Sequence, residues 1–375
     1  MVSVTEVRSG REIREFLRFP LRLYRNCPYY APPLYGDEKK LLRNGGANED
    51  TESVFFLAER DGKTVGRIQA LIQRQHNLKH GSAQMRFTRF DCIDDPEVSA
   101  ALFSAAENWG AARGMNEICG PLAYSDLDRE GLLVEGFEEE ATFEEQYNYP
   151  YYPDLVEEYG FKKDADWVEF ELKKPEQRNE MLVRVARRAL EINHLHIAPT
   201  DLSKRDYIEK YRDGFFECLE VCYRNLYGTV PLTRSEQDEL ISQFMLIVNK
   251  KFLIFICDDS DRVVGFGLCF PGIAGAVRPS GGRLTPAALI RILRAVSDPK
   301  TVDLGLVAVL PEYQRSGVNA VILNGLLDLL EAGETERCET NLNLETNAPV
   351  LAQWKYFNAR QHKRRRCYVK KIGER

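Results

Sequence analysis

The sequence predicts an α+β protein made of two similar halves, each a mixed, mostly antiparallel β-sheet flanked by helices. The first reason is a repeated hairpin pattern. Residues 54–72 and residues 252–271 each begin with an apolar strand, pass through an Asp-containing turn and a Val-Gly pair, and end with a second strand. The second reason is the spacing of the hairpins, which is the length of a domain and not of a short repeat. The chain of 375 residues has room for two such domains.

The segments around the two hairpins also correspond. Each hairpin is preceded by a strand and an amphipathic helix, and is followed by a strand, a helix and a further short strand. In the first half these elements are expected at residues 2–7, 12–26, 85–93, 96–113 and 117–119. In the second half they are expected at residues 195–202, 205–227, 301–309, 318–331 and 339–344. We therefore predict one domain at residues 1–175 and a second at residues 176–375.

The composition indicates a soluble protein of the cytoplasm. Apolar residues make up 44% of the chain and charged residues 29%, as in globular proteins. The net charge of −6 argues against nucleic-acid binding, which needs a basic surface. There is no run of about 20 apolar residues to span a bilayer, and the charged N-terminus does not resemble a signal peptide. We therefore expect neither a nucleic acid nor a membrane as a partner.

The histidines and cysteines predict no metal centre. The pair His76 and His80 and the pair His194 and His196 each lack a third ligand at a useful spacing. The nine cysteines are scattered along the chain and odd in number, so we expect reduced thiols that lie mostly in the core.

Residues 302–330 carry the strongest functional signal. An apolar run at 304–310 is followed by a Pro-Glu-Tyr turn, a polar loop with Gly317, and the apolar pattern of a helix. A loop between a strand and a helix N-terminus presents backbone N–H groups and the helix dipole to a phosphate. Gly317 would let the backbone approach the ligand closely, and Arg315 would add a charge-assisted hydrogen bond. The alternative is an ordinary strand–turn–helix in which Gly317 serves only the turn.

This loop resembles the pyrophosphate loop of the GNAT (acyl-CoA N-acyltransferase) superfamily. The family pattern is Gln or Arg, two residues, Gly, any residue, and Gly or Ala; here the corresponding residues are Gln314, Gly317 and Asn319. The resemblance implies a tandem of two such domains, and an acyl-CoA such as acetyl-CoA bound beside a splayed strand. The implied coenzyme-binding residues are Val307, Val309, Gln314, Arg315, Ser316, Gly317, Val318, Asn319, Ala320 and Asn347.

The first half lacks the corresponding loop. After its matching strand the sequence runs through Pro96 directly into a helix, without a Gln-x-x-Gly pattern. We therefore predict a single coenzyme site for each chain, in the C-terminal half. The N-terminal half is expected to be a degenerate copy that shapes the acceptor side.

The residues for acid–base chemistry are less well defined. Acyl transfer requires a base for the amine and an acid for the departing thiolate. In the GNAT family a tyrosine on the helix after the next strand often protonates the sulfur. Here that helix opens at Asn347, a candidate N-cap, and Trp354 stands at the position of the tyrosine. We name Tyr356 as candidate acid and Glu345 as candidate base; the alternatives are a packing aromatic and a solvated carboxylate.

Two other segments stand out. Residues 120–153 form a long acidic stretch that ends in a tyrosine cluster, and we expect either a solvated surface or the wall of an acceptor cleft. Residues 362–371 are expected to form a last strand with its cationic residues exposed; the alternative is that some of them meet the 3′-phosphate of the coenzyme.

The sequence therefore predicts an acyl-CoA-dependent N-acyltransferase. It would move an acyl group, such as acetyl, to an unidentified amine on a small molecule or a peptide. The alternative function is a non-catalytic acyl-CoA-binding sensor or scaffold, which the presence of Trp354 favours.

Overall fold

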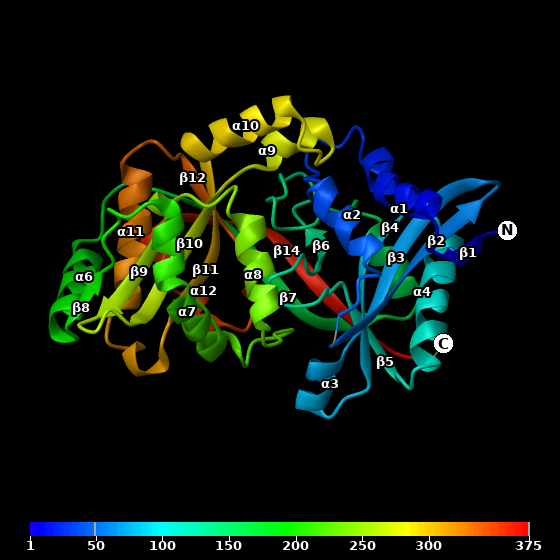
Figure 1. Ribbon diagram of the computed structural model, residues 1–375, viewed down its shortest axis with the longest axis horizontal. Coiled ribbons are helices and arrows are strands. Elements are labelled where there is room, and N and C mark those ends of the chain that lie inside the picture. The colour runs from blue at the N-terminus through cyan, green and yellow to red at the C-terminus, as the bar shows by residue number, and fades with distance from the viewer. Residues whose placement is uncertain (49, 374–375) are drawn as a thin grey trace. The chain divides into compact units, whose positions relative to one another are not determined.

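The computed structural model describes residues 1–48 and 50–373, which fall into two compact units (Figure 1). Unit 1 contains Met1–Val168, Ala274–Leu289 and His362–Arg375, and unit 2 contains Glu169–Ile273 and Ile290–Gln361. The chain thus returns to unit 1 twice after leaving it. Each unit is described separately below.

Unit 1 is a sheet with helices on both faces. Its helices are α1 (Gly10–Leu23), α2 (Tyr35–Arg43), α3 (Arg74–His80), α4 (Pro96–Ala111), α5 (Tyr152–Glu158) and α9 (Ala274–Val277), followed by the 3₁₀ turn η2 (Arg278–Ser280). Its strands are β1 (Ser3–Glu6), β2 (Thr51–Arg60), β3 (Lys63–Gln73), β4 (Gln84–Cys92), β5 (Glu117–Gly120) and β6 (Leu132–Glu135). Strands β1 to β4 pair antiparallel, and β4 pairs with β5 in parallel.

Unit 2 repeats this arrangement. Its strands are β8 (Leu195–Ile197), β9 (Leu253–Asp258), β10 (Val263–Pro271), β11 (Thr301–Val309), β12 (Arg337–Thr340) and β13 (Asn343–Leu344). Strands β8 to β11 pair antiparallel, and β11 pairs with β12 in parallel. Its helices are α6 (Glu180–Ile192), α7 (Lys204–Tyr223), α8 (Arg234–Phe244), α11 (Asn319–Glu331) and α12 (Ala348–Leu351), with the 3₁₀ turns η1 (Lys250–Phe252), η3 (Pro311–Tyr313) and η4 (Trp354–Tyr356).

Three elements pass from one unit to the other along the chain. Strand β7 (Lys162–Lys173) begins in unit 1 and ends in unit 2, where it pairs with β12. Strand β14 (Asn358–Lys371) begins in unit 2 and ends in unit 1, where it pairs with β5 and β6. Helix α10 (Pro286–Ser297) begins in unit 1 and ends in unit 2. Unit 1 therefore contains the end of β14, which follows unit 2 in the sequence. Unit 2 contains the end of β7, whose first residues belong to unit 1.

The two hairpins share an irregularity. In the β2–β3 ladder the register shifts at Val65, next to Gly66, and in the β9–β10 ladder it shifts at Val264, next to Gly265. A bulge puts an extra residue into one strand and increases its twist. A side chain at Gly66 would come within 2.8 Å of Leu102 on α4, so this glycine lets the helix pack closely on the sheet. The predicted mixed, mostly antiparallel α+β fold is confirmed.

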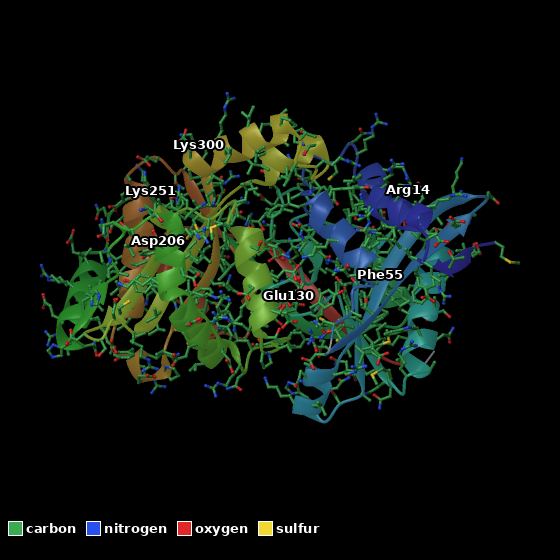
Figure 2. All side chains as sticks on the ribbon, in the orientation of Figure 1. Arg14, Phe55, Glu130, Asp206, Lys251 and Lys300 are labelled. Atoms are coloured by element: carbon green, nitrogen blue, oxygen red, sulfur yellow. The ribbon has the colours of Figure 1, made fainter. Side chains whose placement is uncertain are left out.

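One face of the unit 1 sheet is apolar, whereas the other face combines apolar packing with polar side chains. Ile68 and Ala70 of β3 lie in an apolar core beneath α4, whereas Arg67 and Gln69 point to the opposite face. In the same unit, Phe55 of β2 is buried and Arg14 of α1 is exposed (Figure 2).

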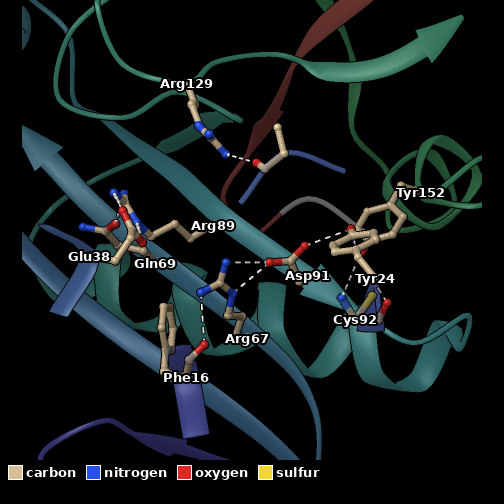
Figure 3. Close-up of polar contacts among 11 residues, drawn as sticks. Phe16, Tyr24, Glu38, Arg67, Gln69, Arg89, Asp91, Cys92, Arg129 and Tyr152 are labelled. Atoms are coloured by element: carbon tan, nitrogen blue, oxygen red, sulfur yellow. Dashed lines mark hydrogen bonds and ion pairs between the residues drawn. The ribbon is translucent and has the colours of Figure 1, made fainter. Parts of the chain in front are cut away.

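This second face contains one buried ion pair and one that is largely buried (Figure 3). Arg67 lies 2.8 Å from Asp91, and Asp91 also accepts a hydrogen bond of 3.0 Å from the Tyr24 hydroxyl. Arg89 donates two hydrogen bonds to Glu38, of 2.9 and 2.7 Å, and a third of 2.7 Å to the side chain of Gln69. Burial alone would raise the pKa of Glu38, but the charge and hydrogen bonds of Arg89 lower it from 4.5 to about 2.

The structure corrects our expectation for the cationic residues of the last strand. Lys363 and Arg365 of β14 are almost completely buried, and Lys370 pairs with Glu107 at 2.8 Å. Arg366 donates a hydrogen bond of 2.8 Å to Asp166 of β7. The expectation that this strand presents its cations to solvent is therefore wrong for these residues, although Lys371 at the end of the strand is exposed. A single sequence does not show that both faces of the strand are covered.

The buried pair of Glu38 and Arg89 predicts a large loss of stability in Glu38→Gln. This change leaves the Arg89 guanidinium largely buried without its anion, so we expect unfolding to become easier by about 3 kcal/mol or more. The matched control is Glu6→Gln, which breaks the exposed pair of Arg8 and Glu6 and should leave the unfolding free energy nearly unchanged. Urea unfolding of the full chain measures the stability of both variants. Equal losses in unfolding free energy would show that burial does not make the pair of Glu38 and Arg89 more important than the exposed pair.

The same pair predicts a pH dependence. Because the pKa of Glu38 is lower in the folded chain, its contribution is fully present above pH 4.5 and is lost as the pH falls towards about 2. The difference in unfolding free energy between the wild type and Glu38→Gln should therefore shrink across this window. A difference that stays constant down to pH 2 would show that Glu38 is not ionised in the folded chain.

Candidate functional site

Strand β11 has an open polar edge beyond its pairing with β12. The parallel ladder between the two strands ends at Leu304 and Thr340, while β11 continues along β10 to Val309. The N–H of Leu310 donates to Val264 of β10, and backbone groups alternate in direction along an antiparallel strand. The N–H and C=O groups of Val307 and Val309 therefore point away from β10, where the sequence analysis placed the coenzyme.

Side chains from the end of α7 contact this edge. The Tyr223 hydroxyl donates to the Val307 carbonyl at 3.1 Å and accepts from the Val307 N–H at 3.3 Å. The Cys222 thiol lies 3.3 Å from the Val309 carbonyl, which also accepts a hydrogen bond of 3.0 Å from the Gln314 side chain. A hydrogen bond from Cys218 lowers the pKa of the Cys222 thiol.

Sequence reasoning did not identify Tyr223 or Cys222 as site residues. The helical pattern at residues 205–227 indicated an amphipathic helix, and α7 forms there. Nothing in the pattern indicated which strand the end of this helix would meet. A contact between residues some 80 positions apart is fixed by the tertiary fold and leaves no local signal.

The loop between β11 and α11 has an unusual backbone. Arg315 has a φ of +69° and Gly317 a φ of +86°, with Ser316 between them. Alternation of left-handed and right-handed residues turns successive N–H groups towards one side, which is a geometry that binds anions. Within the described residues, the N–H groups of Arg315, Gly317, Val318 and Asn319 have no hydrogen-bond partner.

Gly317 is required by packing as well as by its backbone angle. A Cβ atom there would lie 2.9 Å from Val185 Cγ1 and 3.4 Å from Ala189 Cβ, both on α6. The loop therefore approaches α6 so closely that a side chain at position 317 would collide with it. This contact holds the start of α11 in place.

The two units differ at the corresponding helix N-terminus. In unit 1 the Asp95 carboxylate caps α4 by accepting hydrogen bonds from the N–H groups of Glu97 and Val98, at 3.0 and 3.4 Å. In unit 2 the N-cap of α11 is Val318, whose side chain makes no such bond. The helix N-terminus of unit 1 thus already holds a carboxylate, whereas that of unit 2 is open to an anion.

The candidate acid–base residues lie in the segment after β12. The strand expected at 339–344 is interrupted at Asn341, and Glu345 lies half-buried in the turn after β13. Asn347 is the N-cap of α12, as expected, but its side chain makes no capping hydrogen bond. Helix α12 has only four residues, so Trp354 and Tyr356 lie beyond its end, in the following 3₁₀ turn η4.

Trp354 is buried between Phe170 and Phe357, with ring centroids 6.4 and 6.3 Å away. Its indole N–H has no hydrogen-bond partner within the described residues. Tyr356 is half-exposed, and its ring lies 5.2 Å from the Lys355 ammonium. Trp354 therefore has a packing role. The Tyr356 hydroxyl can reach solvent.

One group of side chains has the composition of a metal site. His196, Cys257 and Asp261 have ligand atoms within 4.8 Å of one another. However, the Lys210 ammonium lies 2.6 Å from Asp261 and takes the place of a cation. Burial also raises the pKa of the Cys257 thiol to about 12, so the thiolate needed to bind a metal is disfavoured. This group does not fit a resident metal ion.

Comparison with known proteins gives relatives over most of the chain, although no protein-family model matches it. Protein YghO of Escherichia coli (strain K12) is 27% identical over 371 residues, which covers 96% of this chain and 93% of that protein. The bacterial ceramide synthase of Caulobacter vibrioides (strain NA1000 / CB15N) is 26% identical over 320 residues, covering 84% of this chain and 82% of that protein.

Among solved structures, a tandem GNAT protein from the clavulanic acid biosynthesis pathway aligns over 100% of both chains. The TM-score is 0.56 and the sequence identity 13%. This likeness shows that the chain has the tandem GNAT fold, and it confirms at the level of the fold the resemblance seen in the pyrophosphate loop.

The packing of the loop against α6 predicts a specific effect of Gly317→Ala. The new methyl group meets Val185 and the backbone angle is unfavourable, so we expect a loss of about 2–4 kcal/mol in unfolding free energy. The matched control is Gly333→Ala, where φ is +78° and the space around the new methyl is open; it should cost about 1–2 kcal/mol. Equal losses in urea unfolding would show that the loop does not pack tightly on α6.

Proposed function

We propose that this protein is an acyl-CoA-dependent N-acyltransferase whose coenzyme site is the open edge of β11 with the loop that follows it. The tandem GNAT fold supports acyl transfer in general, and the observation that carries the proposal is the pair of outward-pointing backbone groups at Val307 and Val309. We propose further that residues 1–175 and 176–375 are the two copies of a duplicated domain, which exchange strand segments through β7 and β14.

Each part of the coenzyme has a proposed partner. The amides of the pantetheine arm would pair with the backbone of Val307 and Val309, as an added strand does. The pyrophosphate would accept hydrogen bonds from the N–H groups of the loop, supported by the dipole of α11. Among the residues that the structure describes, the loop donors without another partner are the N–H groups of Arg315, Gly317, Val318 and Asn319.

The remaining candidates have supporting roles in this proposal. The Gln314 side chain donates to Val309, and the Ser316 hydroxyl donates to Tyr313 at 2.7 Å, so both shape the loop. The Ala320 N–H donates to Gly317 and belongs to the first turn of α11. Asn347 lies at the start of α12 and would contact the coenzyme only near its acyl end.

The proposed reaction is direct attack of the acceptor amine on the thioester. The amine nitrogen forms a bond with the carbonyl carbon, the carbon–sulfur bond breaks, and the Val309 N–H would polarise the carbonyl oxygen. The proton of the amine would pass to Glu345, and the coenzyme A thiolate would receive one from Tyr356. Tyr223 is an additional candidate for the second proton, because its hydroxyl lies on the same strand edge.

The acceptor is proposed from the relatives. One of them is named a bacterial ceramide synthase, and a ceramide is the amide of a fatty acid with a long-chain amino alcohol. We therefore add a lipid amine and a long-chain acyl-CoA to the small amines and peptides expected from the sequence. The second candidate function is acyl-CoA binding without turnover, which the buried Trp354 at the place of the usual tyrosine favours.

Coenzyme binding is tested by calorimetric titration of the full chain with acetyl-CoA and palmitoyl-CoA. We expect one site for each chain, and a loss of affinity of about tenfold or more in Arg315→Glu, which puts a negative charge beside the pyrophosphate. The matched control is Arg11→Glu, an exposed residue of α1 with the same change of charge. Two sites, or equal affinity in both variants, would contradict the proposal.

Turnover is tested by release of the coenzyme A thiol in the presence of a small amine, a peptide or sphinganine. Release with one acceptor class assigns the reaction. Binding without release on any of them assigns the sensor function instead. Glu345→Gln should lower the rate and shift its pH dependence if this carboxylate is the base.

Tyr223→Phe tests whether the tyrosine competes with the coenzyme. The change removes both hydrogen bonds to Val307, so an incoming ligand no longer has to displace the hydroxyl. We expect the affinity for desulfo-coenzyme A, a ligand that cannot react, to rise by about threefold to tenfold. Unchanged affinity would place the pantetheine arm elsewhere. The matched control is Tyr211→Phe, which removes a hydroxyl of the same helix that bonds to Asp261.

A further inference from the structure

Helix α10 exposes large apolar side chains to solvent. Leu289 is 38% exposed, Ile290 52% and Leu293 48%, and Leu284 just before the helix is 52% exposed. Single exposed apolar residues are common on protein surfaces and need no explanation. Here four of them lie within ten residues of the chain, on one helix and its leading turn, and adjacent exposed apolar groups of this kind mark interaction sites.

The exposed residues occupy one side of the helix. At about 100° per residue, Leu289, Ile290 and Leu293 fall within an arc of about 100°. Ala288 and Ile292 are fully buried and lie on the other side of the helix. Helix α10 therefore has a buried apolar side that holds it to the protein and a second apolar side that faces outwards.

The segment around this helix is basic. Residues 283–300 contain four cationic residues, Arg283, Arg291, Arg294 and Lys300, and a single acidic residue, Asp298. The chain as a whole has a net charge of −6, so this local excess of positive charge is opposite in sign to the rest. Arg294 is exposed and lies about 40° around the helix from Ile290, at the border of the apolar arc.

The start of the helix is held firmly in unit 1. The Tyr35 N–H donates to the Gly282 carbonyl at 2.9 Å, and Arg278 donates to the Tyr30 carbonyl at 2.9 Å. A side chain at Gly282 would collide with the Pro33 carbonyl, 1.9 Å from its Cβ, so the chain passes very close to this backbone. The segment that leads into α10 is therefore anchored to the backbone of unit 1 by these close contacts.

We propose that the outer side of α10, with residues Leu284, Leu289, Ile290 and Leu293, docks this protein onto a bilayer surface that contains anionic phospholipid. An apolar stripe bordered by arginines inserts its apolar groups among the acyl chains while its cations meet lipid phosphates. A second copy of the chain fits this surface poorly, because a symmetric contact would place one Arg294 near the other. The charge of the segment matches an anionic surface instead.

Docking on a surface differs from spanning a membrane. Within the described residues, no helix is long and apolar enough to cross a bilayer. Our expectation from the sequence that no membrane is involved considered only spanning segments, and the proposal replaces it. The docking does not rest on the proposed function, although a lipid amine or a long-chain acyl-CoA would be met at such a surface.

The test is flotation of the full chain with vesicles of phosphatidylcholine alone or of phosphatidylcholine mixed with phosphatidylglycerol. We expect the protein to float with the mixed vesicles. The triple variant Leu289→Ser, Ile290→Ser, Leu293→Ser should reduce the partition coefficient by about tenfold or more, since each apolar group contributes to insertion. Arg294→Glu should reduce it by several fold, and only with the anionic vesicles.

The matched control is Leu78→Ser on α3, which changes a single exposed apolar residue outside α10. It should float as the wild type does. Failure of the wild type to float, or equal binding by the triple variant, would overturn the proposal. A wild-type dimer without vesicles that the triple variant abolishes would also overturn it, by assigning this side to a second copy. Titration of the triple variant with acetyl-CoA separates loss of docking from loss of the coenzyme site, because docking should fail while coenzyme binding is retained.

Discussion

The open edge of β11 is the constraint on which the rest of unit 2 depends. Parallel strands β11 and β12 separate after Leu304, and backbone N–H and C=O groups that leave a ladder must find other partners. In this protein the partners are the Tyr223 hydroxyl, the Cys222 thiol and the Gln314 amide. Helix α7 must therefore end beside β11, and the loop before α11 must return towards it. Because these partners are side chains and not a neighbouring strand, a ligand that carries amide groups could replace them along the same edge.

The two units share one plan and use their helix N-termini differently. In unit 1 the Asp95 carboxylate satisfies the first N–H groups of α4, which stabilises the helix and removes the anion site. In unit 2 the backbone of Arg315 and Gly317 takes up left-handed angles, and the N–H groups there remain available. Unit 1 instead buries ion pairs such as that of Arg89 with Glu38 on its sheet, where a charge is tolerated only because its partner is fixed by several hydrogen bonds.

Local patterns in the sequence predicted the elements well and their contacts poorly. The hairpins, the loop with Gly317 and the α+β class follow from periodicity and turn residues, which act over a few positions. The contact of Tyr223 with Val307 and the burial of Lys363 depend on strands and helices that are distant in sequence. The prediction for the segment after β12 failed for another reason. Asn347 and Pro349 do mark the start of a helix, but this helix ends after one turn. Beyond its end Trp354 packs against Phe170 of β7, a contact that no short motif encodes.

The exchange of strands β7 and β14 has a consequence for how the chain is made. Strand β14 pairs with β5 through residues such as Tyr368 and Gly120, yet it emerges only after all of unit 2 has been synthesised. Domains generally fold as they leave the ribosome, N-terminal first. Here unit 1 is translated first, but the edge of β5 stays unpaired until β14 has been synthesised. Unit 1 is thus begun first and finished last.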